Sequence, residues 1–162
     1  HREVIMAGSM QPIPGLEVIA VIANNKPQPS TTNTAQKATK FGARYSMGPH
    51  TFWAQIEDVD SNSTFAVVTS VGITTATKGE LKYNWFGYSL KAGNNTFVAQ
   101  YANSGREAAG VPDQDVTFLS LAVLHSLSKN TTLHAGYRKT EVEVGTTTTE
   151  QTVFAGGLRV NF

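Results

Sequence analysis

The sequence has no cysteine and few charged residues, and both absences narrow what the chain can be. The lack of cysteine excludes a disulfide framework and any metal site built on thiolates. Charged residues make up 15 % of the 162 residues, which is below the roughly 25 % of an average soluble domain. The net charge is only +1, so no basic surface is available for nucleic acid, and we expect no nucleic-acid partner.

Long apolar runs are also missing. The longest one, residues 18–23 (VIAVIA), is far shorter than the roughly 20 residues that a membrane-spanning helix needs. A helical membrane protein is therefore excluded. Hydrophobic residues make up 40 % of the chain, and Thr, Ser, Asn and Gly take the place of the missing charges. This composition suits strands that have one apolar face and one neutral polar face.

Signatures of catalysis and of ion binding are absent or incomplete. The sequence has no G-x-S-x-G, P-loop or G-x-G-x-x-G motif. Asp58, Asp60 and Asn62 are spaced like the start of a calcium-binding loop, but Ser63 replaces the required glycine and Thr69 the closing glutamate. A solvated acidic loop explains this segment better.

The histidines near the C-terminus do not predict a site either. His125 and His134 are expected on opposite sides of neighbouring strands, which disfavours a shared metal. Ser126 follows His125 directly, and adjacent residues of a strand point to opposite faces, so the two cannot form a nucleophile and base pair. We expect no enzyme activity, no cofactor and no metal.

Apolar and polar residues alternate along most of the chain, with the period of two that is typical of half-buried β-strands. The clearest case is the C-terminal stretch FAGGLRVNF, in which every second residue from Phe154 to Phe162 is apolar or glycine. Between residues 58 and 80 the periodicity leaves two interpretations open: two loops around one strand, or one structured excursion. Outside that segment, the expected strands are residues 2–9, 15–24, 37–47, 50–57, 81–91, 96–103, 116–127, 131–139 and 154–162.

Short and long connections between these strands alternate in the sequence. Short turns are expected at residues 11–15, 47–50, 93–95 and 128–130, and longer loops at residues 25–36, 58–80, 104–115 and 141–150. Transmembrane β-barrels have short periplasmic turns and longer extracellular loops, so this pattern favours a barrel over a β-sandwich. It also predicts that the short turns lie on the side where the chain ends, which places Phe162 at the periplasmic rim.

Several segments carry a more specific signal. They are residues 88–101 (YSLKAGNNTFVAQY), the turn LSKNT at residues 127–131 with the strand after it, and the C-terminal GLRVNF, together with residues 2–15 and the turn YSMGP at residues 45–49. These segments resemble the C-terminal half of the general, trimeric porins of Gram-negative bacteria. The chain departs from that family at His125, where an aromatic residue is usual.

The resemblance implies an all-β fold, an antiparallel transmembrane β-barrel. The family's barrels have roughly 16 strands and enclose a water-filled channel, whereas about 8 strands leave an interior filled by side chains. Nine expected strands are an odd number, and bacterial single-chain barrels have even numbers. We therefore expect residues 1–162 to be a C-terminal portion of such a barrel rather than a complete single β-barrel domain.

The resemblance also implies a function, a location and partners. The function would be passive diffusion of small hydrophilic solutes and ions through a porin in the bacterial outer membrane, without chemistry. The expected partners are outer-membrane lipid, two further copies in a homotrimer, and the barrel-assembly machinery, which would bind the strand ending in Phe162. Two alternatives remain open: a small closed barrel with a structural or adhesive role, and a porin-like β-protein that forms no channel.

The strand alternation assigns residues to two faces. The polar face would line the pore, and its residues are Glu17, Lys40, Arg44, Gln55, Glu57, Lys91, Gln100, Arg138, Arg159 and Asn161. The apolar face would contact lipid or form the interface girdles, and its aromatic residues are Phe41, Tyr45, Phe52, Phe86, Tyr88, Phe97, Tyr101, Tyr137, Phe154 and Phe162.

The charges of the polar face bear on ion preference, and its tryptophans bear on the assignment of the faces. Five of its residues are basic and two are acidic, so a wide pore would weakly favour anions; the other interpretation is that these are only solvated side chains paired across strands. Trp53 and Trp85 fall on the pore side by the same alternation, which is unexpected unless they belong to an interface girdle or the alternation is misassigned there.

Overall fold

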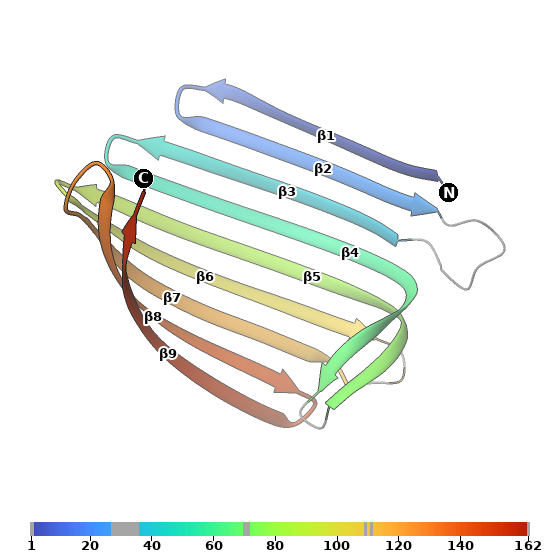
Figure 1. Cartoon of the computed structure of the whole chain (residues 1–162). Helices are drawn as coiled ribbons and strands as arrows, with labels where there is room; N and C mark the ends of the chain where they lie inside the picture. The colour runs from blue at the N-terminus through green and yellow to red at the C-terminus, as the bar shows by residue number, and fades with distance from the viewer. Residues whose placement is uncertain (1, 27–35, 70–71, 109, 111, 162) are drawn as a thin grey trace.

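The computed structural model describes residues 2–26, 36–69, 72–108, 110 and 112–161. These residues form one antiparallel sheet in which each strand pairs with its neighbours in the sequence (Figure 1). The strands are β1 Arg2–Ile13, β2 Leu16–Lys26, β3 Gln36–Met47, β4 His50–Thr69, β5 Gly72–Ala92, β6 Asn95–Ala108, β7 Gln114–Ser126, β8 Thr131–Val144 and β9 Thr147–Val160. Among the described residues there is no helix with the length and apolarity needed to cross a membrane.

The all-β antiparallel fold and the nine strands predicted from the sequence are confirmed. The sheet is curved and open, with β1 and β9 at its two edges (Figure 1). In the part of the chain that the structure describes, β9 pairs with β8 alone and β1 pairs with β2 alone. The described residues alone therefore form an open sheet, which disfavours the alternative of a small closed barrel.

Tight turns lie at the end of the sheet where β9 ends. Three of them are two-residue connections, at residues 14–15, 48–49 and 93–94, and the fourth spans residues 127–130. The backbone N–H of Asn161 donates to the carbonyl oxygen of Asn130 at 2.9 Å, which fixes the end of β9 beside that fourth turn. The prediction that the short turns share a side with the end of the chain is confirmed up to Asn161; Phe162 lies outside the described residues.

The first of these turns depends on glycine for two reasons. Gly15 has a φ of 82°, a backbone conformation that side chains disfavour. A Cβ at this position would also lie 2.3 Å from the carbonyl oxygen of Ser46. The Ser46 N–H donates to the carbonyl oxygen of Gly15 at 2.8 Å, so β3 passes very close to the turn. Glycine at position 15 therefore lets β2 and β3 stay in register at the rim.

The opposite end of the sheet differs from the loop pattern predicted from the sequence. Residues 58–80 are not a loop, because β4 and β5 continue as a paired ladder to Thr69 and Gly72, with a register shift between Ser61 and Thr64. Of the two interpretations left open for this segment, the single structured excursion is correct. Threonine and β-branched residues fit a pleated ladder well, which explains why this segment continues as strand.

Two more of the predicted long loops are mostly strand. Residues 141–150 form the end of β8 and the start of β9, joined by a two-residue turn at Gly145, whose φ is 59°. Residues 104–115 belong largely to β6, which ends at Ala108, and to β7, which begins at Gln114. The strict alternation of short turns and long loops is therefore wrong for these connections. The remaining predicted loop, residues 25–36, lies largely outside the described residues.

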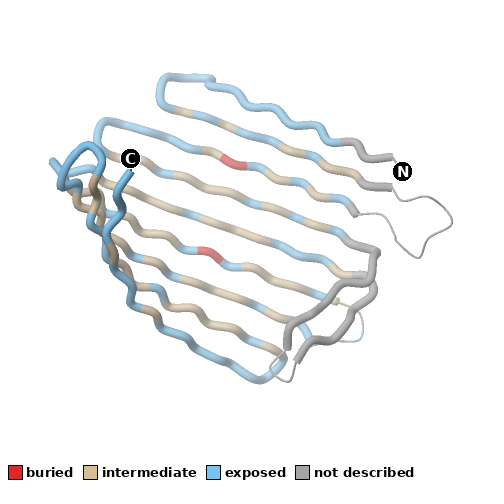
Figure 2. Tube along the Cα trace, viewed as in Figure 1, coloured by how far each residue is buried: buried red, intermediate tan, exposed pale blue. Residues whose placement is uncertain are grey.

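The sheet has no second layer packed against it. Ala102 is the one buried apolar residue among those described, and Figure 2 shows the rest of the sheet as almost entirely intermediate or exposed. Exposed large hydrophobic residues occur on every strand. Apolar area on this scale needs an apolar environment or another protein surface to cover it.

Candidate functional site

The strand register assigns each described residue of the sheet to one of two faces, because successive residues of a strand point to opposite sides. On one face, apolar residues lie next to each other across eight strands. One such row, from β2 to β9, consists of Leu16, Tyr45, Phe52, Tyr88, Ala99, Leu121, Tyr137 and Phe154. We call this surface the apolar face.

The apolar face carries a continuous uncharged band. At the turn end, this face begins with a polar residue on β4, β6, β7 and β8, namely His50, Asn95, His125 and Thr131. Beyond that level, the band runs on each strand from β3 to β9 until the first polar residue interrupts it. These first polar residues are Thr39, Asp58, Asn84, Asn103, Thr117, Lys139 and Thr152. A surface of this kind has the character of the apolar band on the outside of a transmembrane barrel.

The aromatic residues predicted for the lipid-facing surface lie on this face, except Phe162, which is outside the described residues. Two pairs of them are in contact across strands. The ring centroids of Phe52 and Tyr88 are 4.9 Å apart, and those of Tyr137 and Phe154 are 5.1 Å apart. Phe154, on the edge strand, is 78 % exposed. That these rings contact lipid remains a prediction.

Polar pairs mark both margins of the apolar band. At the turn end, Nδ1 of His50 and the hydroxyl of Tyr88 are 2.8 Å apart, and Nδ1 of His125 lies 2.8 Å from Oδ1 of Asn95. At the other end, Lys139 forms an ion pair with Glu150 at 2.8 Å. Amphipathic rings and paired charges at these levels match the composition of membrane–water interfaces.

The opposite face carries the residues predicted to line the pore, and we call it the polar face. The row that crosses it at mid-height consists of Glu17, Arg44, Trp53, Gly87, Gln100, Ser120, Arg138 and Val153. The predicted pore-lining residues Lys40, Gln55, Glu57, Lys91 and Arg159 lie on the same face in other rows. Asn161 follows β9, and its Oδ1 accepts a hydrogen bond from Nε of Arg159 at 3.2 Å.

Only part of the charge on the polar face is neutralised within the sheet. Lys40 and Glu57 form an ion pair at 2.9 Å, and Nε2 of Gln55 donates to Glu57 at 3.5 Å. This pair fits the interpretation that the charges are matched across strands. The other charged side chains that the structure describes on this face form no ion pair with a described residue; they are Glu17, Arg44, Lys91, Arg106, Arg138 and Arg159.

Side chains on the polar face are less exposed than those on the apolar face. Along β4, residues 53, 55 and 57 are half-buried, whereas residues 52, 56 and 58 are exposed. A curved sheet crowds the side chains on its concave side and spreads those on its convex side. The polar face is therefore the inside of the curve seen in Figure 1, as the interior of a water-filled barrel would be.

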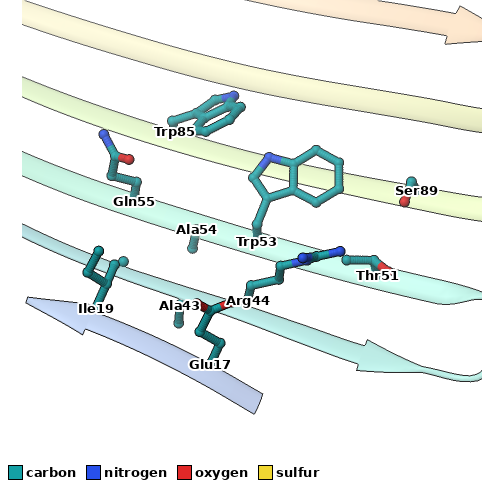
Figure 3. A pocket seen from close by; sticks show the side chains of 11 residues that line it. Glu17, Ile19, Ala43, Arg44, Thr51, Trp53, Ala54, Gln55, Trp85 and Ser89 are labelled. Carbon is teal, nitrogen blue, oxygen red and sulfur yellow. The ribbon is translucent and has the colours of Figure 1, made fainter. Parts of the chain in front are cut away.

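Both tryptophans lie on the polar face, so the strand alternation was assigned correctly there. Their ring centroids are 6.1 Å apart with an interplanar angle of 63°. They line an open hollow with Glu17, Arg44 and Gln55 (Figure 3). Sequence reasoning missed this hollow, because only the register brings β2, β3, β4 and β5 together at this level.

Metal chemistry finds no support in the described residues, which contain no group of three potential ligands. His125 and His134 lie on opposite faces, as the sequence predicted, because His125 is aligned with Leu133 and His134 with Leu124.

Comparisons with known proteins agree with this geometry. A family model described as Gram-negative porin matches residues 18–145. The solved structures similar to this chain include OmpT, an outer membrane protein of Vibrio cholerae. Its in-vitro folded form has a TM-score of 0.78 and 16 % identity over 98 % of this chain and 49 % of that one. The form expressed in the outer membrane has a TM-score of 0.77 and 16 % identity, over 98 % of this chain and 49 % of that one. A mutant lacking loop L8 has a TM-score of 0.76 and 17 % identity, over 99 % of this chain and 52 % of that one.

The chain thus spans about half the length of these OmpT structures, and identities of 16–17 % speak to the fold alone. No curated protein matches the chain. The family model, by contrast, covers most of the sequence, from the third residue of β2 to the end of β8. The chain belongs to the Gram-negative porin family, whose members are non-enzymatic β-barrel proteins of the bacterial outer membrane.

Proposed function

We propose that the polar face forms part of the wall of a water-filled channel, through which small hydrophilic solutes and ions cross the outer membrane by passive diffusion. One observation carries the proposal: the register separates an uncharged apolar band on the convex face from unpaired charges on the concave face. A lipid-exposed surface must be apolar, whereas charges are tolerated where water reaches them. Charged residues on β2 to β6, β8 and β9 give the polar face the second character.

The channel needs more wall than this chain supplies. The described sheet is open at β1 and β9, and the chain spans about half of the similar porin structures. We infer that the remaining wall comes from further strands of the same barrel, with residues 1–162 as its C-terminal portion. A barrel of about 16 strands encloses an aqueous interior, which is the property that the proposed diffusion requires.

The charges of the polar face favour anions weakly. Lys40 and Glu57 neutralise each other in their ion pair. Among the described side chains, five basic residues, Arg44, Lys91, Arg106, Arg138 and Arg159, then remain against Glu17. An excess of positive charge along a pore wall concentrates anions near it. Salt screens this effect within about 8 Å at physiological ionic strength, so the selectivity will be modest.

Two partners follow from the same proposal. The exposed aromatic residues of the apolar face offer a surface for two further copies of the protein, in a homotrimer embedded in lipid. The alternating strand β9 and the residues after it, up to Phe162, would be recognised by the barrel-assembly machinery. Unheated electrophoresis of the full-length protein tests the trimer: a band that shifts to monomer size on heating supports it, and a monomer without heating contradicts it.

Conductance measurements test the channel. The full-length protein, purified in detergent, is added to a planar lipid bilayer in KCl solution. Stepwise, ohmic increases of current are expected, with a reversal potential in a KCl gradient that indicates weak anion preference. Insertion of folded protein without any ion current would contradict the proposed function.

A further inference from the structure

The described part of the polar face contains a concave site with the size and lining of a small-molecule site. The hollow has a volume of about 460 Å³ and lies across β2, β3, β4 and β5 (Figure 3). Pockets that hold small ligands typically measure roughly 300–1,000 Å³ and combine aromatic walls with a few polar groups. The side chains that give this hollow its chemistry are Glu17, Arg44, Gln55, Trp53 and Trp85.

The indole of Trp53 is held against the sheet. A Cβ on Gly87 would lie 2.0 Å from Cε2 and 2.2 Å from Nε1 of Trp53, so the ring occupies the space that a side chain at position 87 would fill. Figure 3 shows the ring leaning from β4 across β5. Nε1 is buried and has no hydrogen-bond acceptor among the described protein atoms. One face of the indole is thus covered by the sheet, and the other is turned to the hollow.

Trp85 adds a second aromatic surface. Its ring meets Trp53 in an edge-to-face arrangement, with an interplanar angle of 63°. Such pairs are mutually stabilising, and the contact fixes both rings in place. The two indoles form an aromatic corner among the polar side chains of the hollow. A corner of this kind offers a flat apolar surface to a ring-shaped solute that passes along the wall.

Groups that form hydrogen bonds stand beside the aromatic corner. Glu17 and Arg44 are aligned across β2 and β3, and neither forms an ion pair with a described residue. Gln55 lies on the same face, two residues beyond Trp53. The carboxylate accepts hydrogen bonds, the guanidinium donates them, and the amide does both. Their formal charges cancel, so the hollow as a whole favours a neutral ligand.

We propose that this hollow binds one ring of a neutral sugar while it passes through the channel. The inference rests on the proposed function, because it requires that the polar face line the channel. A pyranose ring has an apolar C–H face, which fits an indole plane, and a rim of hydroxyl groups. Hydroxyls both donate and accept, so they match Glu17 and Arg44 together. An anion would meet the carboxylate of Glu17, and an apolar solute would leave both charged groups unpaired.

The tryptophans supply a direct readout. Both tryptophans of residues 1–162 line the hollow, so sugar binding there should change tryptophan emission, and this change should be lost in Trp53→Leu. The full-length protein in detergent is titrated with maltotriose, and the current through single channels is recorded with and without the same sugar. We expect a saturable emission change and a transient reduction of the current. Trp53→Leu should weaken maltotriose binding at least about tenfold, since stacking on an aromatic ring contributes on this scale.

Phe118→Leu is the matched control. Phe118 lies on the polar face, in the same row as Trp85, with Ala102 on β6 between them, and it does not line the hollow. Its variant should keep the maltotriose affinity within about twofold of the unmodified protein, which is the scale of a site that takes no part in binding. Trp85→Leu provides a second test if Trp53→Leu fails to fold, as judged by loss of its conductance steps in KCl.

The possible outcomes separate this inference from the proposed function. A protein without KCl current overturns the proposed function. A protein that conducts KCl, but shows neither an emission change nor a current reduction with maltotriose, overturns the sugar site alone. A saturable response to adenosine and none to maltotriose would also overturn it, because the corner would then select aromatic rings. Equal loss of affinity in Phe118→Leu and Trp53→Leu would contradict the placement of the site in the hollow.

Discussion

The indole of Trp53 lies over the backbone of Gly87, in the space where any other residue at position 87 would place its Cβ. That Cβ would be 2.0 Å from Cε2 of Trp53, far inside van der Waals contact. The two residues are aligned across β4 and β5. A large ring on one strand thus depends on the absence of a side chain on the next, and this dependence shapes the hollow on the polar face.

Gly87→Ala should displace the Trp53 ring. The new methyl group forces the indole away from the sheet, and overpacking of this kind costs about 1–3 kcal/mol. Tryptophan emission of the folded variant should shift, because the ring becomes more exposed to water, and its midpoint of unfolding in urea should fall. Gly8→Ala is the control, since a Cβ there meets nothing within 4 Å. Equal stability of both variants would show that Trp53 does not occupy this position.

Alanine substitutions at Gly15 and Gly48 distinguish the effect of backbone strain from that of a steric clash in the tight turns. Both glycines have positive φ, at 82° and 57°. A Cβ at position 15 would lie 2.3 Å from the carbonyl oxygen of Ser46, whereas a Cβ at position 48 meets nothing within 4 Å. Alanine at position 48 should therefore destabilise by about 1 kcal/mol, and alanine at position 15 by about 2–3 kcal/mol or more. Unfolding in urea measures both, and a smaller effect at position 15 would contradict this view of the first turn.

Breaking the ion pair between Lys40 and Glu57 should change ion selectivity, because both residues lie on the polar face. Lys40→Glu places two carboxylates on neighbouring strands of the polar face and removes a positive charge from it. The reversal potential in a KCl gradient should shift toward cation preference. Lys82→Glu makes the same charge change on the side of the apolar face, next to Asp58, and should leave the reversal potential unchanged. A shift of the same size in both variants would refute the assignment of Lys40 to the channel wall.

Leu121 and Ser120 are adjacent on β7 and lie on opposite faces. Leu121 sits in the middle of the apolar band and is 45 % exposed. Arginine there should destabilise the protein in lipid vesicles by about 2–4 kcal/mol, the cost of a charge on the lipid side near mid-depth. Ser120→Arg should cost little, because the charge would be in water. If the two variants unfold at the same urea concentration, the apolar face does not contact lipid.

Features that depend on neighbouring residues could be predicted from the sequence, whereas features that depend on residues far apart in the chain could not. The alternation of apolar and polar residues is local, so it predicts which face of the sheet carries Phe41, Glu57 and Arg138. It also predicts the correct face for Trp53. Strand ends were harder to predict. The Thr-rich residues 141–150 have the polarity of a loop, but the pairing of Glu141 with Glu150 shows a continuing ladder, because β-propensity and cross-strand pairing outweigh polarity.

Contacts between distant residues could not be predicted at all. The contact of Trp53 with Gly87 exists only because β4 and β5 pair in one register over a long hairpin. A shift of one residue would move every side chain of a strand to the other face. The alternating pattern restricts the register to every second residue, and the tight turn at Gly48 and Pro49 sets that of β3 and β4. No such local signal fixes the register of β4 and β5, because these strands are joined after Thr69, far along the chain from Trp53 and Gly87.

The central claim is that the polar face meets water in a channel while the apolar face meets lipid, and cysteine accessibility tests it most directly. The sequence has no cysteine, so a single one introduced into it is the only thiol in this part of the protein. Gln100 and Ala99 are neighbours on β6 with opposite faces. In planar bilayers, a charged water-soluble thiol reagent should react with Gln100→Cys and reduce the current, and leave Ala99→Cys unmodified. Modification of Ala99→Cys with no reaction at Gln100→Cys would contradict the claim.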